Sequence, residues 1–104
     1  MKQFLITYRF KNGSEDEWHR NIATFIAAID ADPELTGKMT YRCMKASAGP
    51  EYYHLATVVD DDTVKTLQSR EFFTRYTGQT ESVADGEVEV MPLTIVAETA
   101  SLAG

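Results

Sequence analysis

The chain has 104 residues, of which 43% are apolar and 25% are charged, fractions that are typical of a folded globular protein. This length supports one domain, because a second domain would have too few residues to bury its own core. Ten Lys and Arg against sixteen Asp and Glu give a net charge of −6, which disfavours binding to nucleic acid or to an anionic membrane surface.

The sequence predicts a cytoplasmic location. Its single cysteine, Cys43, cannot close an internal disulfide, which suits a reducing compartment. Lys2, Arg9 and Lys11 interrupt any apolar run near the start, so we expect no secretory signal. No uncharged stretch approaches the length of a membrane span, about 20 residues.

The first third of the chain predicts a strand and then a helix. Residues 3–10 alternate, and one face of this strand carries only apolar and aromatic side chains: Phe4, Ile6, Tyr8 and Phe10. Ser14 stands three residues before Glu17, the spacing of a capping box at a helix start. An apolar stripe of helical period begins at Trp18 and places this residue in the core, and Pro33 closes the segment.

A predicted hairpin occupies the middle of the chain. Residues 38–46 and 51–59 contain many aromatic and β-branched side chains, which favour strands. The turn residues Gly49 and Pro50 separate them, so we expect the two strands to pair.

A second helix and a last strand complete the predicted order. The acidic residues 60–62 suit the N-terminus of a helix whose apolar positions run to Tyr76, with a bend near Ser69. We expect a loop over residues 77–86 and a strand over residues 87–97. Pro92 lies within this strand and cannot donate to a sheet, which predicts an edge position or a bulge.

The predicted order is therefore β-α-β-β-α-β. This order indicates an α+β fold of the ferredoxin-like kind, a four-stranded antiparallel sheet with both helices on one face. We expect residues 1–98 to form the single domain and residues 99–104 a short C-terminal tail.

Both faces of the predicted sheet carry apolar side chains, although two helices can cover only one face. Along residues 51–59, Tyr53 and Leu55 alternate with Tyr52 and His54, and neither set is clearly polar. A monomer seldom exposes an apolar patch of more than roughly a few hundred Å2. We therefore expect a homodimer, in which two sheets pack face to face across a two-fold axis.

Two stretches carry a resemblance to a known family. Residues 55–61 (Leu-Ala-Thr-Val-Val-Asp-Asp) end a strand in an acidic pair, and residues 67–72 (Leu-Gln-Ser-Arg-Glu-Phe) lie in the following helix. In this pattern and in the order of its elements, nearly the whole chain resembles the antibiotic-biosynthesis-monooxygenase-like domains of the dimeric α+β barrel superfamily. The resemblance implies a ligand bound between the second helix and the sheet.

The same resemblance implies several activities: cofactor-free oxygenation of aromatic polyketides, quinol oxidation and haem degradation, beside many members without known activity. The helix position that is often His in the monooxygenases is Thr66 here, which makes Thr66 a candidate ligand-binding residue. The position of the haem-ligating His in the haem-degrading branch is Tyr76. Haem degradation is therefore not carried over, and haem binding through Tyr76 is a third hypothesis.

His54 is the candidate catalytic base. It lies in the middle of a strand among aromatic residues, and a pKa near neutrality would let it take the proton of a bound phenol. Tyr76 is the candidate polar group that orients the ligand. The alternative for His54 is a hydrogen-bonded histidine at the dimer interface.

Other aromatic residues are candidates for a pocket that holds a planar ligand, and they would equally fill a core: Tyr8, Tyr41, Tyr53 and Phe72. We expect no metal site. The consecutive carboxylates of residues 60–62 suit a helix start better than a calcium loop, and the histidines and Cys43 lack zinc spacing.

The sequence thus favours a homodimer that binds an apolar, aromatic or quinol-type small molecule and needs no cofactor. As an enzyme it would catalyse cofactor-independent oxidation of an activated phenol or quinol, whose deprotonated form can pass an electron to dioxygen in a dry cavity. The alternative is a non-catalytic ligand-binding or stress-associated dimer.

Overall fold

The computed structural model describes residues 1–101 and follows the predicted order, with a division of the second helix. The last three residues of the predicted tail, residues 102–104, lie outside the described part of the chain. In chain order the elements are β1 (Lys2–Arg9), α1 (Glu15–Ala31), β2 (Met39–Lys45), β3 (Glu51–Val58), α2 (Asp61–Gln68), α3 (Glu71–Val83) and β4 (Glu89–Leu93).

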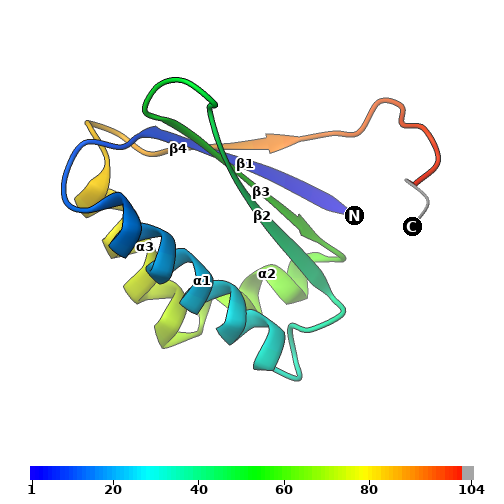
Figure 1. Cartoon of the computed structure of the whole chain (residues 1–104). Helices are drawn as coiled ribbons and strands as arrows, with labels where there is room; N and C mark the ends of the chain where they lie inside the picture. Colours follow the sequence, from blue (N-terminus) through cyan, green and yellow to red (C-terminus); the bar gives the residue numbers. More distant parts are fainter. Residues whose placement is uncertain (102–104) are drawn as a thin grey trace.

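The strands form one antiparallel sheet in the order β2-β3-β1-β4, and the three helices cover one face of it (Figure 1). This arrangement confirms the ferredoxin-like α+β prediction and the hairpin of β2 with β3. β4 lies at an edge of the sheet, where Pro92 is opposite Phe4 of β1, so the edge position predicted from Pro92 is also confirmed.

The register of the strands decides which side chains face the helices, because residues directly opposite each other share a face. Ile6 of β1 is opposite His54 of β3 and Val90 of β4, and this row faces the helices. One residue along, Leu5 is opposite Leu55 and Met91, and this row lies on the other face, called the outer face below.

α1 supplies the largest part of the core. Its buried residues follow the predicted stripe: Trp18, Ile22, Phe25 and Ile29. The predicted cap is also present, because the Ser14 hydroxyl oxygen accepts a hydrogen bond of 3.3 Å from the backbone N–H of Glu17. The prediction that Trp18 belongs to the core is confirmed, since it is almost fully buried.

The predicted bent helix is in fact two helices that meet at Ser69 and Arg70. The Ser69 hydroxyl donates to the carbonyl of Thr66 (2.6 Å) and closes α2. The Arg70 guanidinium donates to the Asp32 carboxylate at the end of α1, with Nε to Oδ2 at 2.7 Å. This half-buried ion pair fixes the start of α3 in a new direction, which explains why the chain turns where only a bend was expected.

The loop predicted over residues 77–86 is wrong, because α3 continues to Val83. Gly78 suggested a turn, but the buried face of the helix runs on from Tyr76 to Thr80. The Thr80 hydroxyl also donates to the Tyr76 carbonyl (2.9 Å). Packing of this face outweighs the low helix propensity of one glycine.

The last strand is shorter than predicted, since β4 spans Glu89–Leu93 instead of residues 87–97. Leu93 is opposite Gln3, next to the first residue of β1. Beyond Leu93 the neighbouring strand has almost no backbone left to pair with, so the ladder ends there.

Candidate functional site

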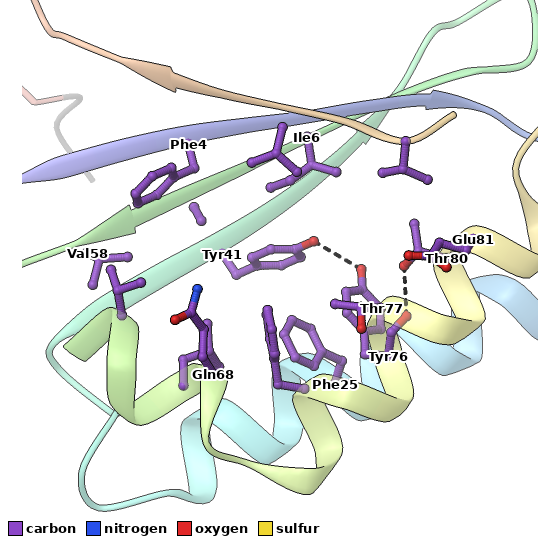
Figure 2. A pocket seen from close by; sticks show the side chains of 16 residues that line it. Phe4, Ile6, Phe25, Tyr41, Val58, Gln68, Tyr76, Thr77, Thr80 and Glu81 are labelled. Atoms are coloured by element: carbon purple, nitrogen blue, oxygen red, sulfur yellow. Dashed lines mark hydrogen bonds between the residues drawn. The ribbon is translucent and has the colours of Figure 1, made fainter. Parts of the chain in front are cut away.

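A cavity of about 300 Å3 lies between the sheet and the helices α2 and α3 (Figure 2). Its lining is mostly apolar and comes from β1 (Phe4, Ile6), α1 (Phe25), α2 (Leu67) and α3 (Phe73), among others. Its volume is at the lower end of the range for small-molecule sites, about 300 to 1,000 Å3, so it suits one or two fused rings.

Two tyrosine hydroxyls form the polar part of this wall. Tyr41 reaches the cavity from β2 and Tyr76 from α3, and Figure 2 shows their hydroxyls pointing toward one another, 3.1 Å apart. The exposed side chains of Gln68 and Glu81 add polar atoms to the lining. A ligand in the cavity would therefore meet apolar surface with one pair of hydroxyls.

His54 lies behind this pair and is fully buried. Its Nδ1 is 2.5 Å from the Tyr41 hydroxyl and 3.1 Å from the Tyr76 hydroxyl. Its Nε2 is 2.8 Å from the Tyr8 hydroxyl, which in turn accepts a hydrogen bond of 2.8 Å from the indole Nε1 of Trp18. We call these five connected side chains, from Trp18 to the two cavity tyrosines, the histidine relay.

The relay carries no charge near neutral pH. Burial lowers the pKa of His54 from 6.5 to about 4, so the imidazole is neutral at pH 7. Burial also raises the pKa values of Tyr8, Tyr41 and Tyr76 above that of an ordinary phenol, so all three hydroxyls keep their protons. Haem binding through Tyr76 stays a prediction.

Aromatic contacts hold the relay in place. Tyr76 is stacked between Phe25 and Trp18, with ring centroids 3.8 Å and 5.6 Å away. Tyr8 stacks on Tyr52 at 5.3 Å. These buried rings have few alternative positions in a close-packed core, so the hydroxyls are preorganised.

Tyr52 connects the aromatic core to the surface. Its hydroxyl donates to the Glu15 carboxylate (2.7 Å) and lies 2.7 Å from Nε2 of His19. The hydrogen bond from Tyr52 lowers the pKa of Glu15. The exposed ring of His19 therefore has a protein partner across the start of α1.

Four of the predicted site residues come together in the relay: His54, Tyr76, Tyr41 and Tyr8. Tyr53 does not, since it lies on the outer face and is 40% exposed. Thr66 is also outside the cavity lining, and its hydroxyl donates to the carbonyl of Asp62. Phe72 packs against Phe25, while its neighbour Phe73 lines the cavity.

The sequence reasoning missed the polar role of Trp18. An indole N–H usually finds an acceptor when it is buried, and Tyr8 is that acceptor here. The signal was therefore present in the residue type, but the partner depends on how α1 lies across β1.

Within residues 1–101, no three His, Cys, Asp or Glu side chains form a group that would hold a metal ion. Burial raises the pKa of the half-buried Cys43 to about 11, so its thiol is protonated at neutral pH. Asp60 accepts from the backbone N–H of Thr63 (2.8 Å), which confirms the predicted helix cap. No helix in this described part has the length and apolar character that a membrane crossing requires.

The sequence matches no protein-family model and no curated protein. Comparison with solved structures is decisive for the fold. SnoaB, a cofactor-independent oxygenase from Streptomyces nogalater, superposes with a TM-score of 0.75 at 13% identity, over 96% of this chain and 97% of that one. The chain has the antibiotic biosynthesis monooxygenase fold.

Two further structures with this fold support that conclusion. A putative antibiotic biosynthesis monooxygenase from Caulobacter crescentus has a TM-score of 0.77 at 13% identity, with 92% of this chain and 90% of the other covered. Rv0793 from Mycobacterium tuberculosis has a TM-score of 0.76 at 11% identity, with coverage of 95% and 98%. At these identities the likeness concerns the antibiotic biosynthesis monooxygenase fold alone.

Proposed function

We propose that this chain binds a small aromatic or quinol-type molecule in the cavity between the sheet and helices α2 and α3. The observation that carries the proposal is an apolar cavity whose wall includes the paired hydroxyls of Tyr41 and Tyr76. Burial of aromatic carbon would drive binding, and the hydroxyls would fix the position of one ligand oxygen. SnoaB, which has the same fold, is a cofactor-independent oxygenase.

A second candidate function is cofactor-independent oxidation of the bound molecule. His54 connects to the cavity through Tyr41 and Tyr76, and most of the side chains that line the site are apolar. An activated phenol or quinol held there as its anion would pass an electron to dioxygen. In this function Tyr76 touches the ligand, and His54 acts on it only through a tyrosine hydroxyl.

We also propose that the protein is a homodimer and that it is located in a reducing compartment such as the cytoplasm. Exposed apolar side chains of the outer face, including Met44, Tyr53 and Met91, support the dimer. The single free cysteine supports the compartment.

Binding is tested with 1-naphthol, a two-ring phenol, by isothermal titration calorimetry. Val64 lines the cavity from α2, so Val64→Phe fills part of the space and is expected to weaken binding by at least roughly tenfold. The matched control is Val96→Phe, because Val96 is exposed beyond β4 and its replacement should leave binding unchanged. Equal binding by both variants would place the ligand outside this cavity.

Oxidation is tested in the same samples by oxygen uptake with 1,4-naphthohydroquinone, measured above the rate without protein. Uptake that is lost in His54→Gln and kept in Tyr53→Phe supports the second function, since Tyr53 lies on the outer face. Binding without any uptake leaves the protein a non-catalytic binder.

A further inference from the structure

The direction of each hydrogen bond in the histidine relay follows from the donors and acceptors available. The Trp18 indole has an N–H and no acceptor, so it donates to the Tyr8 oxygen. Among the described residues, the other polar neighbour of the Tyr8 hydroxyl is Nε2 of His54. The Tyr8 proton therefore points to Nε2, which must present its lone pair.

This direction fixes the tautomer of His54. A neutral imidazole carries one N–H, so with Nε2 as acceptor the proton is on Nδ1. Nδ1–H then donates toward the Tyr41 oxygen, 2.5 Å away, and cannot accept from either tyrosine. The hydroxyls of Tyr41 and Tyr76 share one contact with each other, which uses only one of their two protons. One hydroxyl proton is left without a partner inside the relay.

The opposite tautomer of His54 would leave an unpaired hydroxyl proton in the buried core, where it has a higher free-energy cost than in the cavity. With the proton on Nε2, His54 would donate to Tyr8, and Tyr41 and Tyr76 would both find acceptors. The Tyr8 proton would then have no acceptor, in a side chain that is almost fully buried and does not line the cavity. An unsatisfied buried donor is costly, whereas a proton of Tyr41 or Tyr76 can reach an acceptor in the cavity that both line.

We propose that the histidine relay presents a hydroxyl proton to the cavity, so that the site selects aromatic ligands with an acceptor oxygen over ligands that offer only a donor. The class comprises aryl ketones, quinones and phenolates. This inference rests on the proposed function, because the ligand is taken to occupy the same cavity. Tyr8 is then a positioning residue that holds His54 in the Nδ1–H form, and the relay holds the oxygen of a bound anion instead of taking a proton from it.

The tautomer is measured without any ligand by long-range 1H–15N NMR of protein labelled at histidine. We expect His54 to show a protonated Nδ1 and a bare Nε2 at pH 7. His19 is the second histidine and serves as the internal reference. A protonated Nε2 on His54 would overturn the inference, whatever the protein binds.

The selectivity is measured with three bicyclic probes of matched size: 1-indanone, which only accepts, indole, which only donates, and indane, which does neither. We expect 1-indanone to bind about tenfold more tightly than indane, the value of one hydrogen bond, and indole no more tightly than indane. Equal affinities, or a preference for indole, would overturn the inference. Binding of none of the three would contradict the proposed function, and the NMR result would still decide the tautomer.

Variants separate the relay from general packing. In Tyr41→Phe or Tyr76→Phe the remaining hydroxyl still carries a free proton, so each single variant should keep the preference for 1-indanone. The double variant should lose it, while Tyr53→Phe, on the outer face, should keep it. Loss of the preference in either single variant, or its survival in the double variant, would contradict the proposed direction of the relay.

Discussion

At the residue scale, the environment of His54 connects the site to the stability of the fold. The imidazole is fully buried, and its three hydrogen-bonding neighbours are neutral hydroxyls, so no negative charge compensates a proton on the ring. Its pKa falls from 6.5 to about 4 for this reason. A histidine held in this way contributes more as a fixed hydrogen-bonding group than as a strong base.

Stability should therefore depend on pH through His54. The unfolded chain binds a proton at this residue below pH 6.5, and the folded protein does so only below about pH 4. The neutral, buried His54 therefore makes its full contribution to the free energy of unfolding above pH 6.5. This contribution, about 3 kcal/mol, is lost as the pH falls to 4. We expect urea unfolding of the wild type to show this loss between pH 7 and pH 4, and His54→Gln to lack it. Parallel pH profiles for the two proteins would contradict the low pKa.

The residue types of the site could be predicted from the sequence, but their neighbours only in part. His54 and the aromatic residues are chemically distinctive, and four of these predicted residues do meet in the relay: Tyr8, Tyr41 and His54 from strands and Tyr76 from α3. Tyr53 and Tyr52 could not be told apart, because alternation gives two faces without saying which one the helices cover. That choice depends on the packing of α1, α2 and α3 against the sheet.

At the element scale, the order of strands and helices follows from local patterns. Capping at Ser14 and Asp60, alternation in β1 and the edge-strand Pro92 are properties of short segments, and they predicted the fold correctly. The break between α2 and α3 depends on Arg70 contacting Asp32, residues far apart in the sequence. No local pattern contains such a contact, so the break and the end of α3 were missed.

The cap on α2 gives a testable prediction at this scale. Asp60 accepts hydrogen bonds from both the backbone N–H and the hydroxyl of Thr63, at 2.8 and 2.7 Å. Asp60→Ala leaves these donors without the carboxylate, and we expect the Tm to fall by about 5 °C in a domain of this size. Asp62→Ala removes an equal charge from the first turn without removing the cap, so its Tm should fall less. A comparable fall in both variants would mean that charge, and not the cap, stabilises α2.

At the scale of the whole molecule, the two faces of the sheet differ in what covers them. Helices cover the face that carries the histidine relay (Figure 1). On the outer face of the described chain, Leu5 and Leu55 lie opposite each other at the centre, with Met91 beside them, 51% exposed. An apolar surface of this kind favours association, and a two-fold axis would bring the same patch of a second copy against it.

The last prediction concerns this association. Leu5→Lys places a charge at the centre of the outer face, where it would be buried without a partner in a dimer but solvated in a monomer. We expect the wild type to sediment at about twice the monomer mass of 11.7 kDa, and Leu5→Lys to dissociate at concentrations at least roughly a hundredfold higher. Ala27→Lys adds the same charge at an exposed position of α1, and this control should stay dimeric. A wild type that sediments as a monomer at micromolar concentration would show that the outer face is solvated, and the cavity behind it would then have to be complete within a single chain.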